Sequence, residues 1–152
     1  MKILVLSDSH GDMWRLREIF SRERGFSLCV FLGDGERDLE PFFPMPDVPL
    51  LAVRGNCDLA SSLPTKLITR EGGKTLFLTH GYEQFVKYGL SALRSAARDA
   101  HADIALYGHT HVPVQEYDDG LYLCNPGSVR NGDYAVLEIV PQGVMWLPKR
   151  IG

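Results

Sequence analysis

The chain has 152 residues, of which 45% are hydrophobic, a size and composition that predict one domain over residues 1–152. Its net charge is −3 and its Lys and Arg residues are scattered, so the sequence lacks the basic face of a nucleic-acid-binding protein. We therefore do not expect a nucleic-acid partner. Three cysteines without Cys-x-x-Cys spacing, no leader-like start and no apolar stretch of membrane-spanning length favour a reduced cytoplasmic protein with no membrane segment.

Apolar runs bounded by polar or glycine-rich turns predict the strands. In chain order these runs are Ile3–Leu6, Leu28–Leu32, Leu50–Val53, Leu67–Arg70, Thr75–Leu78, Ile104–Tyr107, Leu121–Cys124, Tyr134–Val140 and Val144–Leu147. Gly72-Gly73 marks the turn of one hairpin, and the last two runs predict a closing hairpin at a sheet edge. The most apolar runs are typical of strands covered on both faces.

Two stretches between the strands have helical spacing. Asp12 fits the N-cap of a helix that includes Leu16 and Phe20 and that Gly25 closes. A second helix is predicted from the apolar stripe Leu90, Leu93, Ala97 and Ala100. A short helix is expected at Arg37–Glu40. Strands that alternate with helices indicate an α/β fold.

Two aromatic segments have more than one interpretation. Pro41–Pro49 is proline-rich and must be irregular, and its two Phe and Met either pack on the core, the favoured interpretation, or form the contact of a homo-oligomer. In the loop from Tyr82 to Tyr88, the aromatic side chains of Tyr82, Phe85 and Tyr88 either line the mouth of a site or pack as a loop cluster.

Polar side chains follow the carboxyl ends of five predicted strands. They are Asp8, His10, Asp34, Asn56, His80, His109 and His111. Open α/β sheets place their ligands at this edge, so we expect the seven side chains to converge. Four of the five histidines belong to this set, and only His101 lies outside it. Folding alone gives no reason to place carboxylates and imidazoles at several strand ends.

The inventory of nitrogen and oxygen ligands fits two divalent metal ions better than one. Ligands without thiolate indicate Mn, Fe, Zn, Ni or Co, of which we expect Mn. Two neighbouring cations need a shared ligand, and Asp34 is the predicted bridge because Gly33 and Gly35 permit close approach to it. Gly108 is expected to let the backbone turn sharply before His109.

The same residues resemble the motifs of a known family. Asp8-x-His10, Gly33-Asp34, Gly55-Asn56, His80 and Gly108-His109-Thr110-His111 resemble, in order, the five motifs of the calcineurin-like metallophosphoesterases. The turn Asn125-Pro126-Gly127-Ser128 and the short length are similar to the small YfcE-type branch of phosphodiesterases. The match runs from Ile3 to Ser128. It implies a four-layer α/β/β/α sandwich.

The resemblance also implies the ligand set and the chemistry. Asp8, His10 and His111 would hold one metal ion, Asn56, His80 and His109 would hold the second, and Asp34 would bridge them. A hydroxide that bridges the ions would attack phosphorus in line. Asp34, Asn56 and His80 would be the catalytic residues, and a small phosphodiester would be the substrate.

One position departs from the family pattern. Where many members have a His that protonates the leaving oxygen, this chain has Cys57, a weaker donor that we interpret mainly as filling space beside the substrate. We therefore predict a preference for activated diesters, such as aryl phosphodiesters, over alkyl monoesters. Arg54 is a candidate for binding the substrate phosphate, although such a residue is more often a solvated loop residue.

Two other functions remain open at this level. A retromer subunit of eukaryotic cells resembles the same small fold and acts mainly by binding partners, but its metal residues are partly replaced and none is missing here. The second alternative is a metal-dependent nuclease, and the net negative charge of the chain argues against it.

Overall fold

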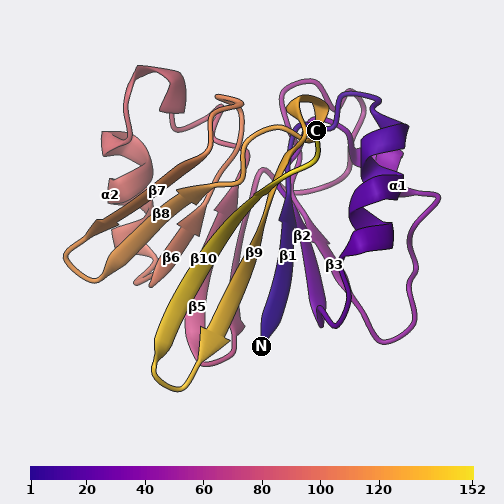
Figure 1. Cartoon of the computed structure of the whole chain (residues 1–152). Coiled ribbons are helices and arrows are strands. Elements are labelled where there is room, and N and C mark those ends of the chain that lie inside the picture. The colour runs from indigo at the N-terminus through magenta and orange to yellow at the C-terminus, as the bar shows by residue number, and fades with distance from the viewer.

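Two mixed five-stranded sheets make up the centre of the molecule in the computed structural model, which describes residues 1–152 (Figure 1). The first sheet has the order β10 (Gly143–Arg150), β9 (Asp133–Val140), β1 (Lys2–Leu6), β2 (Leu28–Phe31), β3 (Leu50–Ala52). The second has the order β4 (Lys66–Glu71), β5 (Lys74–Thr79), β6 (Ile104–Leu106), β8 (Leu121–Asn125), β7 (Val114–Asp118).

The two faces of each sheet bury different layers of side chains, because successive residues of a strand point to opposite faces. Ile3 and Val5 of β1 belong to the apolar cluster that joins the two sheets, which also contains Leu76 and Leu106. Leu4 and its neighbours in β1 and β2 face the other way. Every residue of β2 is buried, as expected for a strand covered on both faces.

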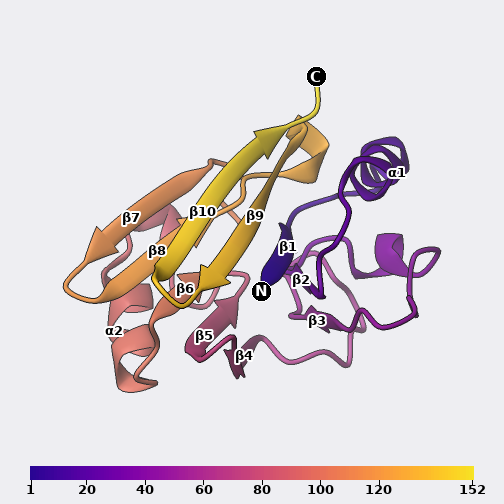
Figure 2. The same ribbon diagram turned by 60° about the horizontal axis from the view of Figure 1, so that its bottom comes forward.

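Each outer face is covered by one helix. Leu16 and Ile19 of α1 (Met13–Arg22) pack against the first sheet, and Leu93 and Ala97 of α2 (Ser91–Asp99) pack against the second. Both views show α1 and α2 on opposite sides of the sheets (Figures 1 and 2). The α/β/β/α sandwich predicted from the sequence is therefore confirmed.

The helix α1 begins as predicted and ends earlier. Asp12 accepts a hydrogen bond from the backbone N–H of Arg15 at 3.0 Å, as an N-cap should. The prediction that Gly25 closes the helix is wrong, because the chain already leaves it at Glu23, which has an extended backbone. The Glu23 side chain is buried and accepts a hydrogen bond from Tyr134, and this contact fixes the exit.

Three short 3₁₀ helices complete the element list, namely η1 (Glu36–Leu39), η2 (Val86–Tyr88) and η3 (Val129–Asn131). The first lies within one residue of the predicted short helix at Arg37–Glu40. In the irregular Pro41–Pro49 segment, Phe42 stacks on Phe20 with ring centroids 4.6 Å apart, which supports core packing for this aromatic. No helix is both long and apolar enough to cross a membrane.

The connections put the ends of several parallel strands on one side of the molecule. In the first sheet β1, β2 and β3 run parallel, and in the second β5, β6 and β8 do. The predicted hairpins β4–β5 and β9–β10 are confirmed. The sequence analysis missed β7, which is largely exposed and lies at the edge of its sheet.

Candidate metal centre

The loops that follow four parallel strands bring six of the seven predicted side chains into one cluster. Asp8 and His10 follow β1, Asp34 follows β2, His80 follows β5, and His109 and His111 follow β6. The ligand atoms of Asp8, His10 and His111 lie within 4.8 Å of one another, as do those of Asp34, His80 and His109, and a third such group, His10, Asp34 and Cys57, links the two. The convergence expected from the strand ends is present in the structure.

Five of these side chains stand on residues with a left-handed backbone. The φ angles are +55° for Asp8, +43° for His10, +63° for Asp34, +71° for His109 and +63° for His111. This conformation is uncommon for residues other than glycine, and the strain is of order 1–2 kcal/mol for each. Backbone strain of this kind clusters where side chains must be aimed at a functional site.

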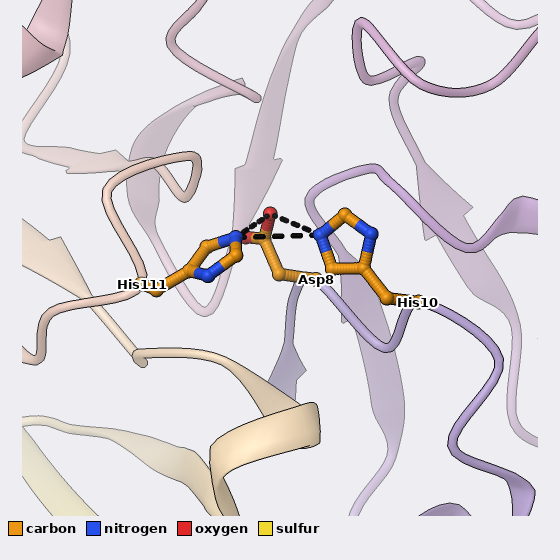
Figure 3. Close-up of side chains that lie close together, drawn as sticks. All are labelled: Asp8, His10 and His111. Carbon is orange, nitrogen blue, oxygen red and sulfur yellow. Dashed lines mark hydrogen bonds and ion pairs between the residues drawn. The ribbon is translucent and has the colours of Figure 1, made fainter.

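Asp8 has one carboxylate oxygen held by the protein and one directed at imidazoles. Its Oδ2 accepts hydrogen bonds from the Ser7 hydroxyl and from the backbone N–H of His109. Its Oδ1 lies 3.1 Å from Nε2 of His111 and 3.5 Å from Nε2 of His10. Figure 3 shows these three side chains pointing toward one another. The Nε2 atoms of His10 and His111 are 3.3 Å apart.

Asp34 is arranged in the same way and contacts both sides of the cluster. Its Oδ1 accepts a hydrogen bond of 2.7 Å from the backbone N–H of Cys57. Its Oδ2 lies 3.2 Å from Nε2 of His80 and 3.8 Å from Nε2 of His10. Burial would raise the pKa of Asp34, but the hydrogen bond and charge of His80 together with the Cys57 N–H lower it to about 2.

The two histidines on the other side of Asp34 face each other. Nε2 of His80 and Nδ1 of His109 are 3.2 Å apart. The Nδ1 of His80 is 2.7 Å from the carbonyl oxygen of Leu32, which orients the ring. Burial lowers the pKa of His80, but the hydrogen bond with Asp34 and the charges of Asp8 and Asp34 outweigh this and raise it. Burial and the charges of His80 and Lys87 lower the pKa of His109, which favours the neutral form that binds metals.

Two glycines are required because other groups of the site occupy the space beside them. A Cβ on Gly108 would run into the Ser7 hydroxyl and Asp8 Oδ2, and one on Gly55 would run into Asp34. The chain turns tightly after Gly108, as expected, with a hydrogen bond of 2.8 Å from the Thr110 N–H to the Gly108 carbonyl oxygen, and the left-handed residue of this turn is His109. Gly108 also allows the loops after β1 and β6 to approach closely.

A further acidic residue, which the sequence analysis did not select, holds the Asp34 loop in place. Asp58 is 9% exposed, and its two carboxylate oxygens accept hydrogen bonds from four backbone N–H groups. These belong to Asp34, Gly35, Glu36 and Gly55, at 2.8 to 3.1 Å. The signal was present in the sequence, since Asp58 follows the Gly55-Asn56 motif by two residues.

The Asn125–Ser128 turn supports the cluster through hydrogen bonds to two of its loops. The Asn125 amide donates to the carbonyl oxygen of Gly108 and to the Thr110 hydroxyl at 3.1 and 3.0 Å. Ser128 donates to the backbone carbonyl oxygen of Asp8 at 2.8 Å. This turn after β8 therefore connects the two loops that carry Asp8 and His109.

The donor set fits divalent cations. Protein ligands bind Zn²⁺ or similar ions at about 2.0–2.2 Å, which places neighbouring ligand atoms roughly 3.0–3.6 Å apart. Most nitrogen and oxygen contacts in the cluster fall within or near this range. The imidazole nitrogens face one another and the carboxylate oxygens, so several lone pairs are directed at a common point. A bound cation would accept these lone pairs.

The remaining predicted residues lie at the rim of the cluster. Asn56 is exposed and lines one cavity with Arg54 and His80 and another with His109. Its amide donates to Cys57 Sγ at 3.6 Å and to none of the six clustered side chains. Cys57 is exposed and lines a separate cavity of about 330 Å³ with His10 and Asp34. Burial and the charge of Asp34 raise the pKa of the Cys57 thiol.

Comparison with known proteins gives a consistent result. Residues 1–140 match the family model of the calcineurin-like phosphoesterase superfamily domain. The chain is 34% identical over 131 residues to a probable metallophosphoesterase, YsnB, of Bacillus subtilis, covering 86% of this chain and 76% of that protein. It is 33% identical over 155 residues to the phosphodiesterase YfcE of Escherichia coli, covering 85% and 79%.

A solved structure with little sequence similarity has the same fold. Vps29 of Chaetomium thermophilum superposes with a TM-score of 0.77 over 100% of this chain and 98% of that chain, at 16% identity. At this identity the likeness supports the architecture alone.

Proposed function

Because the chain belongs to the calcineurin-like phosphoesterase superfamily, we propose that it hydrolyses phosphodiesters at a centre of two divalent metal ions. That the chain is a metal-dependent phosphoesterase follows from the family and its named relatives. The observation that carries the proposal is the position of Asp34 Oδ2, which lies near both His10 and His80. Asp34 Oδ2 thus lies between the two halves of the cluster, as a bridging ligand must, at 3.2 Å from His80 Nε2 and 3.8 Å from His10 Nε2. Asp8 Oδ1 lies nearer to His10 and His111 and is 3.9 Å from His80 Nε2.

The ligands divide into two sets around Asp34. Asp8, His10 and His111 form the first set, and His80 and His109 form the second with Asp34. Asn56 completes the second set from the rim of the cavity that it shares with His109. When bound, the cations supply Lewis-acid chemistry, since they activate water and neutralise the charge that develops on phosphate oxygens.

The chain's own residues orient these groups. Ser7, the His109 N–H and the Cys57 N–H each hold one carboxylate oxygen, so that the other oxygen of Asp8 or Asp34 has a fixed direction. We expect Arg54, which is exposed beside Asn56, to bind the substrate phosphate. Asp34, Asn56 and His80 would be the residues nearest to the reaction.

No spare imidazole is available to protonate the leaving group. Four of the five histidines belong to the cluster, and His101 is exposed after α2. Cys57 lies in the cavity beside Asp34, and a thiol is a weak hydrogen-bond donor. The absence of a good acid typically reduces rates about 10²–10⁴-fold when the leaving group is a poor one. We therefore propose aryl diesters as better substrates than alkyl monoesters, with Mn²⁺ as the preferred ion.

The test combines metal analysis with kinetics. Protein stripped with chelator and reloaded with Mn²⁺ is assayed on bis-(p-nitrophenyl) phosphate and on methyl phosphate. We expect Asp34→Asn to lower the bound metal from two ions to one or none and to lower kcat about 10²-fold or more. The matched control is Asp38→Asn, which changes the same kind of side chain outside the ligand set.

Three results would contradict the proposal. Equal metal content and activity of the wild type and Asp34→Asn would refute the proposed two-metal centre and favour the alternative of a partner-binding scaffold. Turnover of methyl phosphate as fast as that of the aryl diester would contradict the interpretation that Cys57 is a poor proton donor to the leaving group. A salt-dependent affinity for DNA would favour a nuclease instead.

A further inference from the structure

Three large aromatic side chains lie uncovered beside the His109 half of the metal centre. Tyr82, Phe85 and Tyr88 are 57%, 66% and 91% exposed. All three line a cavity of about 690 Å³ whose wall also includes Asn56 and His109. The Tyr82 ring stands edge-on to the His109 ring, with centroids 5.6 Å apart. The aromatic surface is therefore continuous with the proposed site.

The loop that carries these aromatics is anchored from beneath. Val86 is buried and fits against Gly81, where an added Cβ would approach its Cγ2 to 2.7 Å. Thr79 donates a hydrogen bond of 2.9 Å to the Gln84 side chain. Phe85 has a left-handed backbone, with φ +53° and ψ +40°, which is rare for a bulky residue. The chain accepts this strain with the Phe85 ring turned outward.

The polar groups of the cavity complement a charged aromatic ligand. Lys87 lines it together with Glu83, and its positive charge contributes to the lowered pKa of the neighbouring His109. Aromatic walls with a few polar groups are typical of sites for small organic ligands. A cluster of exposed aromatics with a polar rim, next to a metal centre, is more than the scattered apolar exposure of an ordinary surface.

We propose that Tyr82, Phe85 and Tyr88 form an aromatic subsite that binds a planar aromatic substituent of the phosphodiester substrate, a nucleobase or an aryl ring, with Lys87 attracting the phosphate. The inference rests on the proposed function, because the substituent is placed by a phosphate held at the metal centre. It specifies the substrate class of that site.

The other exposed aromatic at the rim fits this role less well. Trp14 lines a cavity with His10 and Arg130 on the opposite half of the cluster. It is a single ring, and the Arg15 guanidinium already lies 5.9 Å from its centroid. The three-residue subsite offers several faces for stacking, whereas Trp14 offers one that is partly taken.

The test compares phosphates that differ only in their substituent. Thymidine 5′-phosphate, phenyl phosphate and methyl phosphate are used as competitive inhibitors of aryl-diester hydrolysis by the Mn²⁺-loaded protein. We expect both aromatic phosphates to bind more tightly than methyl phosphate. Phe85→Ala and Tyr88→Ala should each weaken the aromatic phosphates about 10-fold relative to methyl phosphate, the effect of losing one stacked ring. Thymidine and phenyl phosphates distinguish a nucleobase subsite from a general aryl subsite.

Two controls make the result decisive. Tyr117→Ala removes a tyrosine on β7 that is 63% exposed, nearly as much as Phe85, and whose ring is tilted against Tyr122, and it should leave the ratio of inhibition constants unchanged. Calorimetric titration of the same phosphates gives their affinities without turnover, and the metal content of each variant is measured in parallel.

The outcomes separate the two proposals. Unchanged ratios in Phe85→Ala and Tyr88→Ala, with metal and turnover intact, overturn the subsite and leave the phosphodiesterase function standing. A changed ratio in Trp14→Ala alone also overturns it and places the substituent near His10. A wild type without metal or turnover contradicts the proposed function, and the calorimetric ratios then still decide whether the aromatic surface binds such rings.

Discussion

Replacing Asp58 by Asn removes half of the support of the loop that carries Asp34. The carboxylate accepts four backbone N–H groups, two on each oxygen. The amide retains one acceptor oxygen, and its NH₂ group then faces two N–H donors. Whichever way the amide is oriented, two buried or half-buried donors lose their partner. The variant keeps the side-chain volume and removes one negative charge, so its effect reports on these charged hydrogen bonds and not on packing.

The expected loss follows from the number of bonds. A hydrogen bond to a charged acceptor contributes about 1.5–3 kcal/mol to stability, so losing two of them lowers the free energy of unfolding by about 3–6 kcal/mol. This is a large share of the 5–15 kcal/mol that is usual for a domain. We also expect metal affinity to fall about 10- to 100-fold, because Asp34 loses its orientation.

The assay is urea unfolding of the metal-free protein at pH 7, followed by titration of the folded protein with Mn²⁺. Asp38→Asn is the matched control, because a single oxygen of Asp38 accepts both of its hydrogen bonds, from Ser9 and Gly11. An amide oxygen can accept both, so this variant should lose less than about 1 kcal/mol. If Asp58→Asn were no less stable than Asp38→Asn, the reasoning from the four N–H groups would be refuted.

Three further predictions concern other parts of the structure. In Gly108→Ala the new methyl group meets Ser7, so we expect a loss of about 1–3 kcal/mol in urea unfolding, part of which Ser7→Ala restores in the double variant. Burial raises the pKa of Glu23, but hydrogen bonds from Tyr134, Lys149 and Lys2 outweigh this and lower it. Its contribution is therefore complete above the unfolded pKa and lost as pH falls through the folded pKa, and the roughly 2 kcal/mol lost in Tyr134→Phe at pH 7 should shrink in unfolding curves measured below pH 4. Mn²⁺ at 100 times its dissociation constant should stabilise the protein by about 2.7 kcal/mol per site in calorimetry, and a chelator should reverse this.

The strands of the core could be predicted because their residues are apolar without interruption. Ile3–Leu6 and Leu28–Leu32 are short and entirely apolar, as is typical of buried strands, and both runs lie in central strands of the first sheet. The edge strand β7 could not be found in this way, since Val114–Asp118 is mostly polar and exposed. Its only local signal is Asp119-Gly120, two residues with positive φ that form the turn to β8.

The residues of the site could be named because carboxylates and imidazoles repeatedly follow apolar strands. Their supporting contacts were harder to find. Asp58 follows the Gly55-Asn56 motif in the sequence, but its role depends on four N–H groups from two separate loops, which only the folded chain brings together. The predicted end of α1 was wrong because it also depends on a contact between distant residues. The buried hydrogen bond between Glu23 and Tyr134, 111 residues apart, determines where the chain leaves the helix.

The sequence by itself determined the fold class, the strand ends and the chemical types of the candidate ligands, because these depend on periodicity and side-chain chemistry along the chain. The tertiary structure alone decided which oxygen of Asp8 and Asp34 faces the imidazoles, that Asn56 stays at the rim, and that Tyr82, Phe85 and Tyr88 border the same site. These properties depend on contacts between loops far apart in the chain, whose distances are set only when the two sheets pack together.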